Sequence, residues 1–128
     1  MPWVQGKPNL GFSYGEPWLP VAPAHTALAA VAQERDQAST LWFARSLIAL
    51  RKKHPVLAQG DIKITIATDQ ILAFERIRGG DHITCVFNLS KSEATVPVDK
   101  SGDAVLTVGD VARSGGSLRL GPRSAVLI

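Results

Sequence analysis

The chain has 128 residues, of which 45% are hydrophobic and 20% are charged, with a formal net charge of +3. This length suits one domain with a buried core, and the composition argues against wholesale disorder. Arg51-Lys52-Lys53 is the only basic run, so we expect no nucleic-acid partner, and no apolar run approaches the ~20 residues of a membrane helix. Cys85 is the only cysteine, which excludes an internal disulfide, and no signal peptide is visible. A cytoplasmic location is therefore expected.

Residues 1–36 are predicted to form an irregular loop. Prolines and glycines interrupt this segment repeatedly, at Pro2, Gly6, Pro8, Gly11, Gly15, Pro17, Pro20 and Pro23. The loop also carries four large aromatic residues, Trp3, Phe12, Tyr14 and Trp18. A flexible linker does not normally hold so many, so we expect this loop to pack on another surface. One short helical turn is expected at 27–33.

Residues 37–54 are predicted to form the one long helix of the chain. Apolar residues recur there at steps of three and four, at Leu41, Ala44, Leu47 and Ile48, with Trp42, Phe43 and Leu50 widening the stripe. Asp36 is expected to cap the helix start, because a carboxylate accepts the free amide protons of a first turn. Its end carries the basic run, which suits the helix dipole, and Pro55 should stop it after His54.

Residues 55–128 are predicted to form a small antiparallel β-domain. After a connector at 56–61, six or seven strands are expected, the clearest at 62–66, 71–78, 82–89, 93–98, 104–108, 117–120 and 124–128. Gly79-Gly80-Asp81 and Ser114-Gly115-Gly116 predict tight turns, as does Ser101-Gly102-Asp103. Pro97 indicates an edge strand. The predicted fold class is thus mainly β, with one long helix, an irregular N-terminal loop and an antiparallel β-sandwich.

The polar residues of the chain give no pattern typical of catalysis. Acid–base catalysis by a pair of carboxyl groups needs the two groups close together, ~5 Å apart in the tightest case, and one of them able to hold a proton. The acidic residues lie mostly at turns or strand ends, where carboxylates are solvated. His25, His54 and His82 are too scattered for a metal cluster, and Cys85 falls on an apolar strand face and is expected in the core. We therefore predict no catalytic residue, no metal and no cofactor in this chain.

Several stretches resemble one known family. The N-terminal stretches are Met1-Pro2-Trp3, Asn9-Leu10-Gly11-Phe12-Ser13 and Pro17-Trp18-Leu19-Pro20-Val21. The later ones are Leu47-Ile48-Ala49-Leu50-Arg51-Lys52, His54-Pro55, Gly60-Asp61, Leu72-Ala73-Phe74-Glu75-Arg76, Val86-Phe87-Asn88-Leu89-Ser90 and Pro122-Arg123-Ser124-Ala125-Val126-Leu127. Together they resemble the α-glucosidases and oligo-1,6-glucosidases of the α-amylase superfamily of glycoside hydrolases, over nearly the whole chain.

The resemblance implies that this chain is a C-terminal fragment. Residues 1–36 would be a loop on top of a (β/α)8 barrel, 37–54 the last barrel helix, and 55–128 the C-terminal β-domain. The family's catalytic carboxylates would lie upstream of Met1, which coincides with an internal methionine of the family pattern. The parent would hydrolyse α-linked glucosides with retention and the fragment would be inactive. A trehalose synthase or sucrose isomerase parent stays open.

The resemblance also implies where ligands and partners would bind. Trp3, Phe12, Tyr14 and Trp18 would either line the rim of a site for an α-glucoside oligosaccharide or anchor the loop by packing. The expected partner is the barrel domain of the parent, or a second copy of the chain bound through the exposed helix face. The alternative function is a stand-alone β-sandwich module for carbohydrate binding or interaction. Phe74 and Phe87, expected to point inward, count against it.

Overall fold

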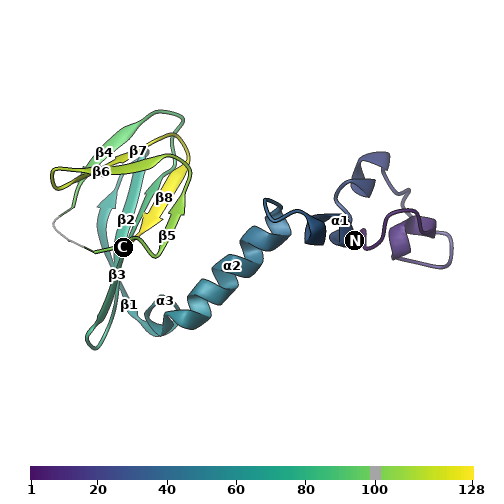
Figure 1. Cartoon of the computed structure of the whole chain (residues 1–128), viewed down its shortest axis with the longest axis horizontal. Helices are drawn as coiled ribbons and strands as arrows, with labels where there is room; N and C mark the ends of the chain where they lie inside the picture. The colour runs from purple at the N-terminus through teal and green to yellow at the C-terminus, as the bar shows by residue number, and fades with distance from the viewer. Residues whose placement is uncertain (99–101) are drawn as a thin grey trace. The chain divides into compact units, whose positions relative to one another are not determined.

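The computed structural model describes residues 1–98 and 102–128, so Ser101 of one predicted turn lies outside the described residues. The chain divides into two compact units, Met1–Lys53 and His54–Ile128. The prediction of a mainly β fold with one long helix is confirmed (Figure 1). Its finer division into 1–36, 37–54 and 55–128 stays a prediction.

The first unit begins with irregular chain. Two short 3₁₀ turns, Pro8–Gly11 and Pro23–Thr26, precede helix α1 at Ala30–Arg35. This helix starts three residues later than the turn expected at 27–33. Contacts with the first residues of the chain explain this start, because the backbone amides of Ala30 and Val31 donate to the carbonyls of Pro2 (3.2 Å) and Trp3 (3.1 Å). The free amides of the first helical turn are thereby satisfied.

Helix α2 spans Thr40–Lys53 and retains its basic last turn. The prediction that Asp36 caps this helix is wrong. The Asp36 carboxylate accepts the amide proton of Ala38 at 2.9 Å, so it closes the turn before the helix. Ser39 is the capping residue, because its Oγ accepts the amide proton of Trp42 at 3.3 Å.

Helix α3, Pro55–Gln59, occupies most of the predicted connector at 56–61. Pro55 stops α2, as expected, but it also starts α3, since proline fits the first position of a helix where no amide proton is needed. The new helix ends at Gln59, just before Gly60, and Val56 is buried.

The described residues of the second unit form eight strands. They are β1 (Asp61–Ala67), β2 (Ile71–Arg78), β3 (Asp81–Asn88), β4 (Ala94–Pro97), β5 (Leu106–Val108), β6 (Val111–Ser114), β7 (Ser117–Leu120) and β8 (Ser124–Leu127). The β2–β3 hairpin, with its turn at Gly79-Gly80, confirms the prediction. Strand β6 was not predicted. It pairs with β7 across Gly115-Gly116, whose φ angles of 52° and 81° require the left-handed region that glycine tolerates.

These strands form two antiparallel layers, as predicted for a sandwich (Figure 1). One sheet has the order β1-β2-β3-β8-β5 and the other β4-β7-β6, so Pro97 lies on an edge strand as expected. The buried core lies between the sheets and consists of Ile71, Ala73, Val86, Val96, Leu118, Leu120 and Val126. Burial of these aliphatic side chains stabilises the unit.

Two predictions are wrong because the residues concerned lie on the outer face of the five-stranded sheet. Ile62 and Ile64 were expected on a half-buried strand, yet they are 56% and 61% exposed. The pairing of β1 shifts between Ile64 and Ile66, so Ile66 packs against the core while the other two face outward. Phe74 and Phe87 also do not point into the inter-sheet core. They stack on each other on the outer face, with ring centroids 5.8 Å apart.

Helix α3 lies against β2 and β3 in the same unit. Arg76 fixes it there, because Nε donates to the carbonyl of Val56 (3.3 Å) and Nη2 to that of Gly60 (2.6 Å). Cys85 is 2% exposed and lies on the same strand face as Ile83 and Phe87, which confirms that it is buried.

Candidate functional site

The first unit contains a surface hollow of about 220 Å³, which we call the loop hollow. It is lined by Met1, Pro2, Asn9, Leu10, Phe12, Pro17, Trp18, Leu19, Pro20, Val21 and His25. Two of the predicted site residues, Phe12 and Trp18, are thus brought together. The other two, Trp3 and Tyr14, do not line it.

A left-handed turn shapes one wall of the loop hollow. Asn9, Leu10 and Gly11 have φ angles of 51°, 53° and 73°. This conformation is common for glycine and tolerated by asparagine, but it is unusual for a bulky residue such as leucine. Leu10 is 9% exposed, and its carbonyl accepts the amide protons of both Trp3 and Val4 at 2.9 Å. Backbone hydrogen bonds and burial therefore hold the strained residue in place.

The side chain of Asn9 ties the turn to the segment that follows it. Its Nδ2 donates to the carbonyls of Ser13 (3.1 Å) and Gly15 (2.9 Å). The loop between Phe12 and Trp18 is thereby fixed to the turn. Sequence reasoning missed Asn9 and His25 as wall residues. The available signal was that Asn9 and Gly11 are both residue types that tolerate the left-handed region.

The aromatic rings of the loop hollow are accessible to a ligand. Trp18 is 91% exposed and Phe12 is 59% exposed. The polar side-chain groups in the lining are the Asn9 amide, the His25 imidazole and the indole N–H of Trp18, and the lining contains no carboxylate, hydroxyl or thiol. This hollow can therefore bind through ring faces and polar groups, but it holds no pair of carboxyl groups of the kind that glycoside hydrolysis needs.

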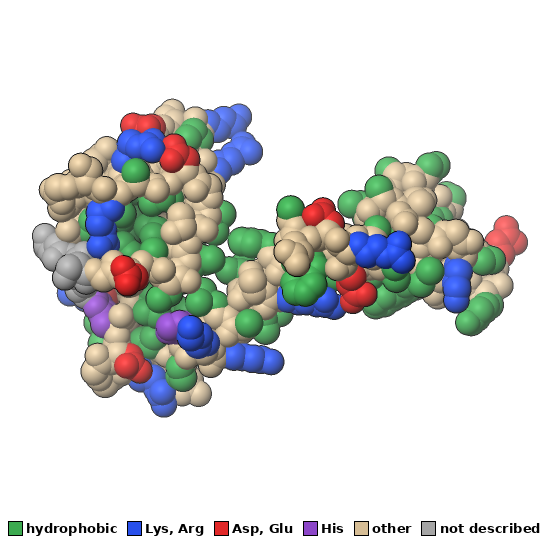
Figure 2. All heavy atoms as spheres, in the orientation of Figure 1, with side chains coloured by type: hydrophobic (Ala, Val, Ile, Leu, Met, Phe, Trp, Pro, Cys, Tyr) green, Lys and Arg blue, Asp and Glu red, His purple; other side chains and the backbone are tan. Residues whose placement is uncertain are grey.

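Helix α2 contains no buried residue, although more than half of its residues are apolar. One side of the helix contacts Glu34 of the same unit. The indole N–H of Trp42 donates to the Glu34 carbonyl (2.9 Å). The Arg45 guanidinium lies over the Trp42 ring and forms an ion pair with the Glu34 carboxylate (2.9 Å). Phe43 and Ile48 remain 43% and 56% exposed. Figure 2 shows hydrophobic side chains at the surface of this unit. The helix therefore presents an uncovered apolar surface.

The ionisable groups of the second unit are arranged as structural contacts. Burial raises the pKa of the Cys85 thiol to about 11 despite the nearby Arg76 cation, so the thiolate is disfavoured. The hydrogen bonds and charge of Arg119 lower the pKa of the Asp110 carboxyl, which is the opposite of what a proton donor needs. Within 1–98 and 102–128, no group of His, Cys, Asp and Glu could hold a metal ion. Asp99 lies outside these ranges.

Comparison with known families shows which family the chain belongs to. A family model described as "Alpha amylase, catalytic domain" matches residues 1–60. A second, described as "Domain of unknown function (DUF3459)", matches residues 62–127, which is more than half of the chain. A probable alpha-glucosidase of Rhizobium meliloti (strain 1021) is 39% identical over 95 residues, and a probable oligo-1,6-glucosidase 2 of Bacillus subtilis (strain 168) is 35% identical over 95 residues. The chain belongs to the α-amylase family of glycoside hydrolases.

Solved structures agree with this membership. An alpha-glucosyl transfer enzyme, XgtA, superposes with a TM-score of 0.80 and 33% identity over 99% of this α-amylase-family chain. The trehalulose synthase MutB from Pseudomonas mesoacidophila MX-45 gives a TM-score of 0.83 at 24% identity, which shows the shared fold alone. The chain covers 24% of each structure, and 17% of the length of the two curated relatives. It therefore corresponds to a portion of these proteins.

Among the described residues, no helix of this α-amylase-family chain has the length and apolar character needed to cross a membrane.

Proposed function

We propose that this chain is a structural, non-catalytic portion of an enzyme that hydrolyses α-linked glucosides with retention. The observation that carries the proposal is the order of the two family matches, in which catalytic-domain sequence at 1–60 adjoins the DUF3459 domain at 62–127. The names of the relatives, alpha-glucosidase and oligo-1,6-glucosidase, support the reaction. We expect no hydrolysis by the chain alone, because the loop hollow, where the exposed rings of Phe12 and Trp18 lie, contains no carboxylate.

The proposed partner is the remainder of a barrel domain, with a second copy of the chain as the alternative. Helix α2 supports this proposal, since none of its residues is buried and Phe43 and Ile48 are exposed. An exposed apolar patch above a few hundred Å² tends to bind another surface.

The aromatic loop is proposed to contribute to a rim for an α-glucoside oligosaccharide. Aromatic ring faces suit the apolar face of a sugar ring, and Phe12 and Trp18 lie in one hollow. The competing explanation, that these aromatics only pack against the rest of a barrel, also fits their exposure.

The proposed location is the cytoplasm. The support is that the sequence has a single cysteine and so forms no internal disulfide. Fractionation of the native source with an antibody against the chain tests this point.

A chimera tests the function. The 95-residue stretch of the Rhizobium meliloti relative that aligns with this chain is replaced by the matching residues of this chain. We expect the chimera to hydrolyse a chromogenic α-glucoside and the 128-residue chain alone to show no turnover. A folded chimera without turnover, or turnover by the pure chain, would contradict the proposal.

A further inference from the structure

The second unit contains a cavity beside its core, which we call the end cavity. Its volume is about 190 Å³, and residues of both sheets line it. Its wall includes Ala73, Glu75, Thr84, Val86, Val96 and Ile128. Three of these residues, Ala73, Val86 and Val96, belong to the buried core. The end cavity is therefore an extension of the space between the sheets.

The register of β2 and β3 gives the end cavity an apolar side and a polar side. Ala73 pairs with Val86, and both side chains are buried in the core. The next pair on the same face is Glu75 with Thr84, because alternate residues of a strand point to the same side of a sheet. A carboxylate and a hydroxyl thus lie beside aliphatic side chains.

The polar side of the end cavity offers three groups that accept hydrogen bonds. The Glu75 carboxylate is one, and its side chain is 19% exposed. Another is the buried Thr84 Oγ1, which has no hydrogen-bond partner among the residues that the structure describes. Since no hydrogen bond holds this hydroxyl, rotation about χ1 can turn it toward the cavity. The third is the terminal carboxylate of Ile128, which already accepts the Thr84 amide proton at 2.8 Å.

The charges at the end cavity favour a cationic ligand. Of the described residues, its wall contains the two carboxylates and no Lys, Arg or His. Lys63 Nζ lies 3.8 Å from one Glu75 oxygen, and His82 Nε2 lies 3.3 Å from the other. The Lys63 side chain is 71% exposed, so its pair with Glu75 contributes little and is screened by salt. A ligand cation can therefore replace Lys63 at a small cost.

We propose that the end cavity binds a small primary aliphatic amine, with its ammonium group bonded to Glu75 and Thr84 and its alkyl chain packed against Val86 and Val96. A primary ammonium has three N–H donors, which match the two carboxylates and the hydroxyl of the polar side. Hydrogen bonds between charged groups are roughly twice as strong as neutral ones. This site lies in the second unit, apart from the loop hollow, and does not depend on the proposed function.

Three compounds of equal chain length test the proposal: n-butylamine, 1-butanol and butyrate. Each is titrated into the isotope-labelled 128-residue chain in phosphate buffer at neutral pH, while NMR follows the methyl groups of Val86 and Val96 and the amide of Thr84. We expect butylamine, which is protonated at this pH, to shift these resonances in a saturable way. 1-Butanol should bind about tenfold more weakly, because it forms only neutral-donor hydrogen bonds. Butyrate should cause no shift, since its charge repels Glu75.

Thr84→Val separates ligand binding from folding. This substitution removes the hydroxyl and nearly keeps the shape of the side chain. We expect butylamine to bind about fivefold more weakly, because one acceptor is lost. The melting temperature should stay the same or rise, because a buried hydroxyl without a described partner is removed.

Glu75→Gln tests the role of charge. It should remove the preference for butylamine over 1-butanol. Glu93→Gln is the matched control, because Glu93 pairs with Arg119 and does not line the end cavity, so both affinities should stay unchanged. If Glu75→Gln does not fold, Lys63→Gln replaces it, and removal of the competing cation should raise the affinity for butylamine.

Three outcomes would overturn the inference: no saturable shift with butylamine, equal affinities for butylamine and 1-butanol, or a butylamine affinity that neither Thr84→Val nor the charge variant alters. None of these measurements involves hydrolysis. An active chimera without amine binding would thus refute only this inference, whereas amine binding with an inactive chimera would refute only the proposed function.

Discussion

Gly60 is confined by backbone atoms on two sides. A Cβ at this position would lie 2.6 Å from the carbonyl oxygen of Val56 and 2.9 Å from that of Ile77. Neither oxygen can move easily, because the first belongs to α3 and the second to β2, and Arg76 holds the Gly60 carbonyl at 2.6 Å. A side chain here would push α3 away from the sheet.

We expect Gly60→Ala to lower the free energy of unfolding of the second unit by about 1–3 kcal/mol, the usual cost of overpacking. Urea unfolding followed by circular dichroism measures this change. Gly80→Ala is the matched control, because a Cβ at Gly80 meets nothing within 4 Å and should cost little. Equal effects of the two substitutions would show that steric crowding at Gly60 is unimportant.

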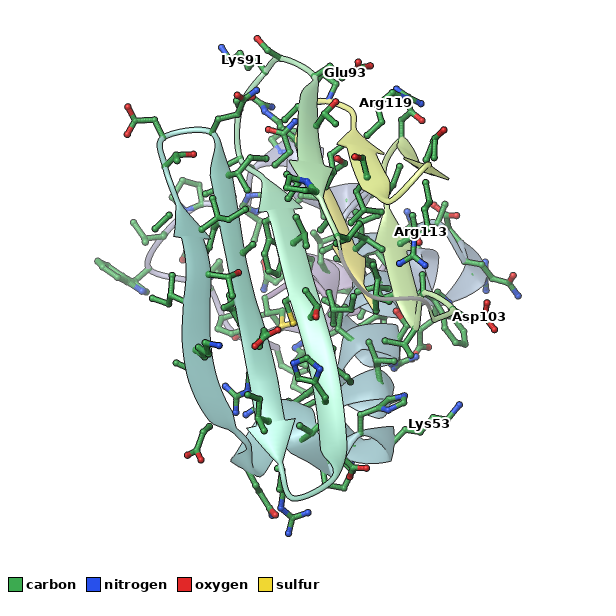
Figure 3. All side chains as sticks on the ribbon, turned by 90° about the vertical axis from the view of Figure 1, so that its left-hand side faces the viewer. Lys53, Lys91, Glu93, Asp103, Arg113 and Arg119 are labelled. Atoms are coloured by element: carbon green, nitrogen blue, oxygen red, sulfur yellow. The ribbon has the colours of Figure 1, made fainter. Side chains whose placement is uncertain are left out.

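Asp110 joins Arg119 and Glu93 in an exposed ion-pair cluster. Arg119 Nη2 lies 2.9 Å from the Asp110 carboxylate, and Nη1 lies 2.8 Å from that of Glu93. Arg119 and Glu93 lie at the same end of the sandwich (Figure 3). The hydrogen bonds and charge of Arg119 lower the pKa of the Asp110 carboxyl below its ordinary value of 3.8. Because the pair is exposed, its contribution to stability is small and screened by salt.

The direction of this pKa shift predicts a pH effect. A carboxyl with a lowered pKa stabilises the folded state above its ordinary pKa, and this stabilisation is lost as pH falls through the folded value. We expect Asp110→Asn to weaken the fall in melting temperature between about pH 5 and pH 2 at low salt. Asp69→Asn, at a turn, is the control. If the melting temperature of Asp110→Asn falls with decreasing pH as much as that of the wild type, the Asp110–Arg119 pair does not form in solution.

At the level of elements, Ser39 defines where the long helix begins. Its hydroxyl accepts the amide proton of Trp42 and donates to the carbonyl of Gln33 at 2.8 Å. The Oε1 of Gln33 also accepts the amide proton of Leu41 at 3.2 Å. The end of α1 and the start of α2 are therefore joined through two side chains.

Ser39→Ala should destabilise the first unit by about 0.5–2 kcal/mol, the typical cost of losing a helix cap. Thermal unfolding, followed by the circular dichroism signal of the helices, measures the effect. Ser46→Ala is the matched control, since Ser46 lies within α2 and its hydroxyl only bonds to the carbonyl of Phe43. If Ser39→Ala and Ser46→Ala behave alike, the capping role of Ser39 is wrong.

The elements also show where sequence reasoning succeeded. Apolar periodicity located α2, and the Gly-Gly turn located the β2–β3 hairpin, because both signals are local. Helix α3 was missed because Pro55 was interpreted only as a stop signal. Strand β6 was missed because it is short and gains its stability from pairing with β7.

At the level of the whole molecule, the two units differ in how far they bury their apolar residues. The second unit buries a core between its sheets, whereas helix α2 of the first unit has no buried residue. We infer that the pure chain associates with itself through the exposed helix face unless another protein covers it.

Replacing Phe43 and Ile48 together by Gln should shift the chain toward the monomer in sedimentation equilibrium, because both apolar side chains are exposed and glutamine preserves the helix. Leu89→Gln is the control, since Leu89 is 59% exposed but lies in the other unit. A wild-type chain that stays monomeric at all concentrations would refute this prediction.

The sequence alone determined the long helix, the antiparallel hairpin and the family, since these depend on local periodicity and on the order of short motifs. It also placed the aromatic residues on one loop. Only the tertiary structure decided that Phe12 and Trp18 share a hollow while Trp3 and Tyr14 do not, and that Ile62, Phe74 and Phe87 lie outside the core. The reason is that left-handed turns, strand-pairing shifts and the choice of which sheet face meets the second sheet all depend on contacts between distant residues, which a local pattern does not contain.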